Sequence, residues 1–191
     1  MADADACSVC DALARARSGD AAAFAVLVRQ HQRAVYSLAL RMLSDPHKAE
    51  DLAQEVFIRL HRGLALLQSD THLLFWLRQV TSRLAIDRLR REPRGELVPL
   101  AEDLPLAGES TMGDPLLQRR LRALIAELPA AARAVVLLRF QEDLDPSEIA
   151  QLLDMPVNTV KSHLKRSLER LRERLTGQAA VPSSGREESP L

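Results

Sequence analysis

The sequence predicts an all-α protein made of two small helical domains joined by a flexible acidic linker. Apolar residues recur every three or four positions through most of the 191 residues, which is the spacing of one buried helix face. Ala, Leu and Arg dominate the composition, and glycine is scarce before residue 95. Between residues 95 and 115 the apolar pattern stops, and prolines and glycines alternate with acidic residues instead.

This pattern divides the chain into five segments. Residues 1–19 form an N-terminal segment that we expect to be partly helical or disordered, and residues 20–94 form the first helical domain. Residues 95–115 are the linker, and residues 116–175 form the second helical domain. The last segment, residues 176–191, is small, polar and proline-containing, so we expect it to be disordered.

Three long amphipathic helices are predicted in the first domain. The first is expected to end near Ser44 and the second near Leu67, with Asp70 capping the third. Trp76 lies among core positions of the third helix and is expected to pack in the core rather than to stack on a base. Short loops between long helices predict antiparallel neighbours in a bundle.

The formal net charge is zero, but the charges are segregated along the chain. Residues 78–94 carry a net charge of +4, from six arginines and two acids. Residues 95–117 carry −5 from five acids and no base, and residues 155–175 return to +4. Such alternating blocks suggest two basic surfaces that an acidic connector holds apart.

Several functional classes are disfavoured by what the sequence contains. Cys7 and Cys10 form one C-x-x-C pair without the further ligands of a zinc site, so we expect no metal there, with a redox or metal role as the alternative. No apolar run approaches the roughly 20 residues of a membrane span, and we expect a cytoplasmic protein without membrane insertion. The five histidines are scattered and no catalytic or nucleotide motif occurs, so no enzyme activity and no cofactor is predicted.

A helix-turn-helix is predicted between Asp145 and Leu171. A capping residue, a proline and an acid begin its first helix at Asp145, and the turn lies at Asp154–Pro156. The second helix presents short polar and basic side chains over its first turns, which is what reading the major groove of DNA requires. A solvated face on an ordinary bundle helix is the alternative interpretation.

Two stretches resemble bacterial sigma factors. Residues Leu144–Leu171, LDPSEIAQLLDMPVNTVKSHLKRSLERL, resemble region 4, the C-terminal DNA-binding domain of this family. Residues 20–91 resemble region 2, through AEDLAQEVFIRLHR and WLRQVTSRLAIDRLRR. The order of the two motifs, without a bulky domain between them, is similar to the extracytoplasmic-function (ECF) group.

The resemblance implies a promoter-specific initiation factor and assigns roles to individual residues. Its partners would be core RNA polymerase, promoter DNA and an anti-sigma factor, and its trigger a stress or envelope signal. Loop 62–71 would melt the minus-ten element, and the acidic linker would thread toward the RNA path of polymerase, with a plain solubilising linker as the alternative.

The resemblance also implies roles for single residues. These are Asp51, Gln54, Glu55 and Ile58 for polymerase binding, Arg83, Arg90, Arg91 and Arg94 for the minus-ten element, and Thr159, Lys161, Ser162, His163, Lys165 and Arg166 for the minus-thirty-five element.

Two other functions remain open on the sequence alone. A sigma-like decoy would bind an anti-sigma factor without supporting initiation, but it could lose its basic faces, and both are present here. A helix-turn-helix regulator without initiation activity would explain residues 144–171 but would leave the DLAQEVF helix without a role.

Overall fold

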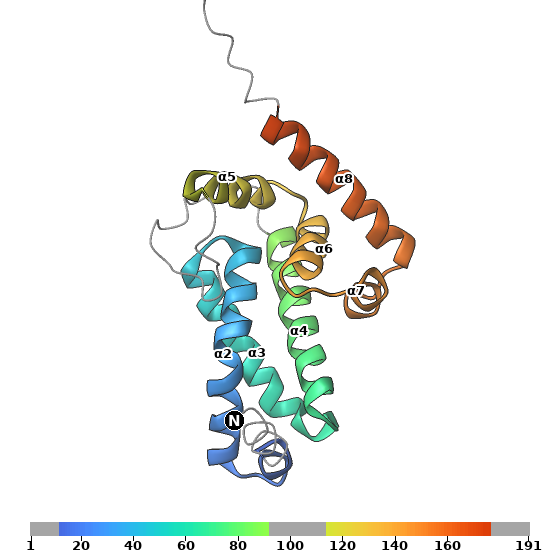
Figure 1. Ribbon diagram of the computed structural model, residues 1–191. Coiled ribbons are helices and arrows are strands. Elements are labelled where there is room, and N and C mark those ends of the chain that lie inside the picture. Colours follow the sequence, from blue (N-terminus) through green and yellow to red (C-terminus); the bar gives the residue numbers. More distant parts are fainter. Residues whose placement is uncertain (1–11, 92–113, 177–191) are drawn as a thin grey trace, which may run out of the picture.

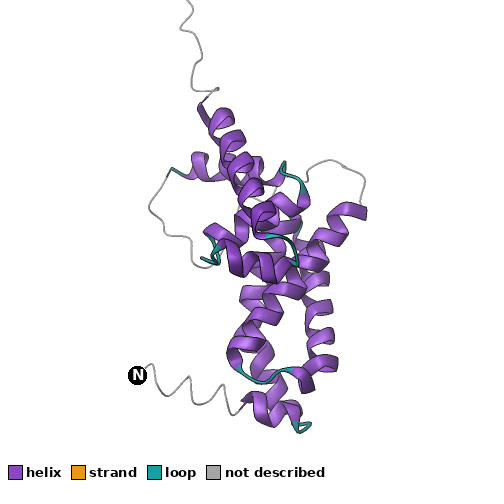
Figure 2. Cartoon of the chain, turned by 90° about the vertical axis from the view of Figure 1, so that its right-hand side faces the viewer, coloured by secondary structure: helices purple, strands orange, loops and turns teal. Residues whose placement is uncertain are grey.

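The computed structural model describes residues 12–91 and 114–176, and the regular secondary structure of these residues is entirely helical (Figures 1 and 2). The Cys7/Cys10 pair, Arg94, the predicted tail beyond residue 176 and nearly all of the acidic linker lie outside these residues. The described helices fall into an N-terminal bundle, α2 to α4, and a C-terminal group, α5 to α8.

Three long helices make up the N-terminal bundle. They are α2 (Ala21–Leu43), α3 (Pro46–Gly63) and α4 (Asp70–Arg91), and a short helical stretch over residues 12–17 precedes them. Consecutive helices run in opposite directions, as the short loops predicted (Figure 1). Each helix buries residues at three- and four-residue spacing, and the largest fully buried side chains are Leu27, Leu40 and Met42 of α2, Leu52, Val56 and Leu60 of α3, and Leu73 of α4.

The helix ends differ from the sequence prediction at two places. The first helix does end beside Ser44, which adopts the left-handed conformation (φ 58°). The second helix ends at Gly63 rather than near Leu67, and a 3-10 turn follows at Leu64–Leu66. The tighter turn brings residues three positions apart onto one side, so that Leu64 and Leu67 are both buried. The cap of α4 is Ser69 rather than Asp70, because the Ser69 hydroxyl accepts a hydrogen bond from the His72 amide at 3.2 Å.

The C-terminal group consists of α5 (Pro115–Ala126), α6 (Ala130–Phe140), α7 (Pro146–Leu153) and α8 (Val157–Thr176). The last two form the predicted helix-turn-helix. Asp145 caps α7 in a reciprocal capping box with Glu148, and Asp154 ends the helix in the left-handed conformation (φ 54°). Hydrogen bonds at the cap also hold the pKa of the Asp145 carboxyl below its usual value.

Helix α6 is buried on every side. All seven residues from 132 to 138 are buried, which is the pattern of a helix enclosed by others. It packs against α8 on one side and against α2 and α4 on the other. The two helical groups therefore touch (Figure 1).

Two large apolar residues of the C-terminal group are exposed although they share the apolar spacing of their helices. Phe140, at the end of α6, is 59% exposed, and Leu168 of α8 is 45% exposed. Phe140 is the last residue of its helix. Leu168 lies on the exposed side of α8, whereas Leu171, one turn further on, is buried.

The left-handed residue at the helix-turn-helix turn gives a testable prediction. Replacing Asp154 with Gly is expected to raise the free energy of unfolding by about 0.5 to 1 kcal/mol, because glycine has no Cβ to strain this conformation. Asp154→Val, which introduces a β-branched side chain, is expected to lower it. Urea unfolding of the full chain measures both changes. Destabilisation by Asp154→Gly would show that the aspartate side chain itself stabilises the turn.

Candidate nucleic-acid and polymerase interfaces

Exposed arginines line one face of α4. Arg83, Arg90 and Arg91 are all exposed, and the seven- and eight-residue spacing from Arg83 places them on one side of the helix. The fourth residue predicted for this face, Arg94, lies outside the described residues. The three described arginines form a basic surface that a nucleic-acid backbone can approach.

Arg88 lies on the same helix but is turned inward. Its guanidinium donates a hydrogen bond to the Glu55 carboxylate at 2.9 Å and another to the Lys48 main-chain carbonyl at 3.1 Å. Both acceptors belong to α3, so Arg88 holds α4 against α3. Sequence reasoning did not single out this residue, because an arginine in a basic run looks the same whether it faces outward or inward.

The α3 stripe consists of the four residues predicted to bind polymerase, Asp51, Gln54, Glu55 and Ile58. Three of them are exposed, and the fourth is hydrogen-bonded within the protein. Asp51 and Gln54 are exposed, and Ile58 is 53% exposed although it is a large apolar side chain. Glu55 differs from them, because its carboxylate accepts hydrogen bonds from both Arg88 and Arg59, the latter at 2.6 Å. These hydrogen bonds hold the pKa of Glu55 below its usual value, the one from Arg88 having the larger effect.

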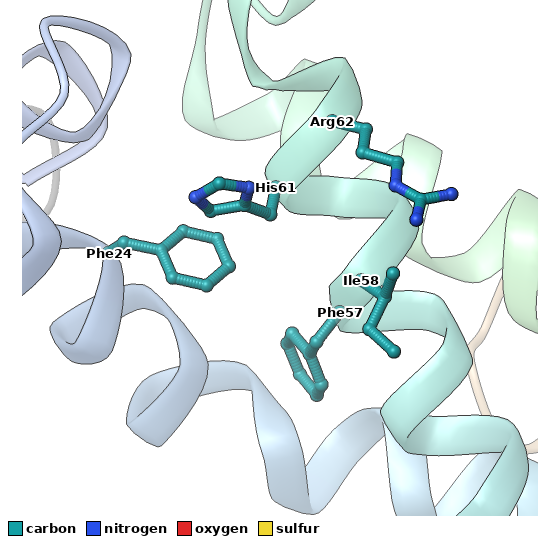
Figure 3. A pocket seen from close by; sticks show the side chains of 5 residues that line it. All are labelled: Phe24, Phe57, Ile58, His61 and Arg62. Atoms are coloured by element: carbon teal, nitrogen blue, oxygen red, sulfur yellow. The ribbon is translucent and has the colours of Figure 1, made fainter.

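A shallow apolar hollow lies next to this stripe. It has a volume of about 410 Å³ and is lined by Phe24 of α2 and by Phe57, Ile58, His61 and Arg62 of α3. Figure 3 shows the Phe24 and His61 rings meeting across the gap between the helices, with ring centres 5.0 Å apart and an interplanar angle of 84°. Ile58 thus borders an apolar surface that the sequence pattern did not predict, because Phe24 and Phe57 are spaced like core residues.

The loop predicted to melt DNA begins at the end of α3 and reaches the start of α4. Its most exposed apolar residue is Leu66, which is 76% exposed, while Leu64 and Leu67 on either side are buried. Trp76 is half-buried and packs against the core, as predicted. The loop therefore presents Leu66 to solvent, whereas Trp76 belongs to α4.

The recognition helix α8 presents its predicted residues in two ways. Lys161, Ser162, Lys165 and Arg166 are exposed, whereas Thr159 and His163 are half-buried. Val160, Ser167 and Leu171 face inward and are buried. The buried side of α8 packs against α5, α6 and α7, and its basic face is exposed and can meet a DNA duplex.

His163 is the titratable group of this surface with a shifted pKa. Burial lowers the pKa of the imidazole, and the positive charge of Arg166 lowers it further. The side chain is therefore neutral at pH 7 and offers DNA one donor and one acceptor rather than a charge.

Within residues 12–91 and 114–176, no group of three or more His, Cys, Asp or Glu side chains is placed to bind a metal ion. None of the described helices has the length and apolar character needed to cross a membrane.

Sequence reasoning missed the contacts between the two helical groups. Arg78 of α4 pairs with Glu142 at 2.8 Å, and Arg133 of α6 is buried at the junction. The one available signal was a single arginine inside the apolar run of α6, which alone could not indicate a partner from the other end of the chain.

Two family models match the chain. The model for Sigma-70 region 2 matches residues 27–95, and the model for Sigma-70 region 4 matches residues 118–171. Together they cover more than half of the chain and contain the α3, α4 and α8 surfaces described above.

Named ECF sigma factors are similar over most of the chain. The ECF RNA polymerase sigma factor SigW of Bacillus subtilis is 30% identical, over 83% of this chain and 92% of its own length. The ECF RNA polymerase sigma-E factor of Escherichia coli is 31% identical, over 81% of this chain and 87% of its own. The ECF RNA polymerase sigma factor SigE of Mycolicibacterium smegmatis is 37% identical over 78% of this chain, but the match spans only 60% of that longer relative.

Two solved structures share the fold. CnrH, in complex with the cytosolic domain of CnrY, matches with a TM-score of 0.64 and 20% identity, over 89% of this chain and 98% of that one. The sigma factor RpoE of Bartonella quintana, in complex with the anti-sigma factor NepR, matches with a TM-score of 0.63 and 19% identity, over 80% of this chain and 96% of that one.

The pKa of His163 gives a second prediction. Arg166→Gln is expected to raise this pKa toward the ordinary value of 6.5, because it removes the second cause of the shift. An NMR titration of the imidazole measures the change, and Arg172→Gln, an exposed arginine further along α8, is the matched control. Equal shifts in both variants would show that Arg166 has no specific effect.

The same pKa predicts the sign of a pH dependence. Because the folded pKa lies below the ordinary value of 6.5, the unfolded chain binds more protons near that pH. The contribution of His163 to stability is therefore present above pH 6.5 and decreases as the pH falls through the folded pKa. In urea unfolding, His163→Gln is expected to lose less stability on acidification than the unchanged chain.

Proposed function

The chain belongs to the ECF group of the sigma-70 family, and from this membership we infer that it binds core RNA polymerase and directs promoter-specific initiation of transcription. The observation that carries this inference is the match to both family regions in the order that initiation requires. The decoy and the plain helix-turn-helix regulator each account for only part of this arrangement.

The polymerase-binding surface of the proposed factor is the exposed part of the α3 stripe. Asp51 and Gln54 offer hydrogen bonds, and Ile58 adds an apolar contact at the edge of the hollow. Glu55 acts differently in this proposal. Its carboxylate is already hydrogen-bonded to Arg88 and Arg59. Glu55 therefore fixes α3 against α4 and contributes to docking by positioning the exposed residues of α3.

The minus-ten element of the promoter is assigned to α4 and the loop before it. Arg83, Arg90 and Arg91 supply positive charge for the DNA backbone, and Arg94 would extend this surface. When a base leaves the duplex, the bases beside it lose a stacking partner. The exposed Leu66 of the loop can take the place of that partner as an apolar side chain.

The minus-thirty-five element is assigned to the exposed face of α8. Lys161, Lys165 and Arg166 can bind phosphates or guanine edges, and Ser162 can bind either. Thr159 and His163 are half-buried at the side of this face. They contribute by positioning the exposed residues, and the neutral His163 imidazole can form a hydrogen bond with DNA.

The remaining features of the proposal follow from the family. The factor acts in the cytoplasm together with polymerase, has no catalytic activity of its own and is held by an anti-sigma factor until a stress or envelope signal releases it. The two solved structures with the same fold were each determined with a bound partner, which for RpoE is the anti-sigma factor NepR.

Transcription in vitro tests the proposal directly. Purified protein and sigma-free core polymerase are incubated with fragmented genomic DNA, and the transcript starts are sequenced. Discrete starts that share two spaced upstream elements are the expected result. Core binding without specific starts would favour the decoy, and no core binding would favour the plain regulator.

Recognition by α8 gives a third prediction. Lys165→Ala with Arg166→Ala is expected to abolish promoter use while leaving polymerase binding intact. The salt dependence of DNA binding should also weaken, with the log–log slope falling by about one for each phosphate that the variant no longer neutralises. Arg170→Ala with Arg172→Ala removes the same charge from exposed positions further along α8 and is the control. Equal loss of polymerase binding and promoter use in the first variant would contradict the proposed division of roles.

The α3 surface gives a fourth prediction, which distinguishes residues that contact polymerase from Glu55, which fixes α3 against α4. Asp51→Ala with Gln54→Ala is expected to weaken core polymerase binding by about tenfold, equivalent to roughly 1.4 kcal/mol, with no change in urea unfolding. Glu55→Ala is expected to weaken binding and to lower the free energy of unfolding as well, because it releases Arg88. Glu50→Ala, an exposed acid one residue before Asp51, is the matched control. Unchanged affinity in the double variant would rule out this surface.

A further inference from the structure

Helix α2 carries positive charge without any negative charge. Its sequence, Ala21–Leu43, contains three arginines and no aspartate or glutamate. Arg29 and Arg33 are exposed one helical turn apart, with the exposed Gln30 and Gln32 between them. Among the residues that the structure describes, the side chains of both arginines lack an ion pair and a hydrogen bond. We call these four residues the α2 polar face, and its two charges are available to a partner outside the chain.

The loop assigned to promoter melting, residues 62–71, lies with both ends against α2. Just before its start, the His61 ring meets the Phe24 ring of α2, with ring centres 5.0 Å apart (Figure 3). At its end, Asp70 lies close to His31 of α2. Burial lowers the pKa of the His31 imidazole, and the nearby negative charge of Asp70 opposes this shift. The first half of α2 is therefore the part of this helix next to the loop.

The two arginines lie level with the end of the loop, on the outer side of α2. Arg29 and Arg33 are each two residues from His31, which is about 3 Å along the helix and about 200° around it. Their side chains therefore point away from the core. An α-helix with its side chains is about 10 Å across, so a strand that leaves the loop must pass that distance to reach them. At 3.4 Å for each nucleotide, this distance corresponds to about three nucleotides.

The arginines of α4 lie upstream of the loop and so meet a different part of the promoter. Arg83, the first of them, is 13 residues after Asp70, which is about 20 Å along α4. The end of α4 leads through residues 92–113 to the C-terminal group, whose helix α8 is assigned to the upstream element. The strand that continues from the loop toward the transcription start therefore leaves the basic face of α4 behind.

We propose that the α2 polar face binds the sugar-phosphate backbone of the single strand that loop 62–71 separates, about three nucleotides beyond the minus-ten element on the side of the transcription start. The inference rests on the proposed function, which supplies the loop and the promoter element. The charge identifies the partner, because two arginines with no acid beside them attract phosphates, and a guanidinium can bind two phosphate oxygens at once. None of the four residues is aromatic, so the face holds the backbone without stacking on bases.

Forked DNA probes test the position of this contact. Each probe is duplex upstream of the minus-ten element of a promoter found in the initiation assay. Its non-template strand is single through that element and continues for zero, three, six or nine nucleotides. Fluorescence anisotropy measures the affinity of each probe for the factor bound to core polymerase. Arg29→Gln with Arg33→Gln is expected to bind the unextended probe normally and the six- and nine-nucleotide probes about tenfold more weakly than the unchanged chain does.

A control pair on another helix separates position from charge. Arg170→Gln with Arg172→Gln removes the same charge from exposed positions of α8 and is expected to act equally on probes of every length. Equal weakening at every length by the α2 variant, or weaker binding to polymerase without DNA, would overturn the proposal and assign the face to an acidic protein surface. Unchanged affinity for the extended probes would also overturn it.

A single-stranded oligonucleotide tests the same contact without polymerase. The full chain is titrated with a 15-nucleotide thymidine strand at several salt concentrations. Each phosphate that the protein neutralises contributes about 0.7 to the log–log slope, so Arg29→Gln with Arg33→Gln is expected to lower the slope by about 1.4. Arg29→Lys with Arg33→Lys keeps the charge and should keep the slope. Urea unfolding of both variants should match the unchanged chain, since both side chains are exposed.

The two measurements separate this proposal from the proposed function. If the unchanged chain with polymerase binds no promoter probe, that result counts against the proposed function, and the oligonucleotide titration decides on the α2 polar face. An unchanged slope in the glutamine variant would overturn the proposal even in a chain that initiates transcription. A slope that falls as expected would support the contact even in a chain that does not.

Discussion

The burial of α6 is the constraint on which the rest of the structure depends. A helix with seven consecutive buried residues must be covered on both sides, and neither α8 nor the N-terminal bundle covers it alone. Arg133 adds a positive charge inside this packing, where burial lowers its pKa to about 10. The main-chain carbonyls of Met42 and Ala126 accept hydrogen bonds from its guanidinium and replace the water that would otherwise solvate the charge. The position of the C-terminal group follows from these two requirements.

The pairing of charges between helices explains which side chains are left for function. Arg88 and Glu55 hold α4 against α3 and are therefore half-buried, while their neighbours Arg83, Arg90 and Asp51 remain exposed. Helix α4 thus contacts α3 through Arg88 and presents Arg83 and Arg90 to solvent. The ion pair between Arg88 and Glu55 fixes the position of the exposed arginines of α4 relative to α3.

Much of the fold was predictable because local signals determine it. The apolar spacing located the helices, and the capping residue Asp145 located the start of α7 correctly. The prediction was wrong where tertiary packing overrides local preference. The second helix ends at Gly63, and Leu64 and Leu67 after it are both buried in the core, while Phe140 is exposed although it shares the apolar spacing of α6. The outward residues Lys161, Lys165 and Arg166 were predicted from their spacing, whereas the apolar hollow beside Ile58 was not.

The sequence by itself determined the helices, the helix-turn-helix and the family, because each depends on residues close together in the chain or on the order of two motifs. Only the tertiary structure decided which charged residues face solvent and which join distant helices. Arg83 and Arg88 are the same residue type on the same helix, yet Arg83 is exposed and Arg88 is hydrogen-bonded to α3. The contact of Arg133 with Met42, 91 residues away, has no local signature, because the geometry of a hydrogen bond between distant segments is defined only when the chain has folded.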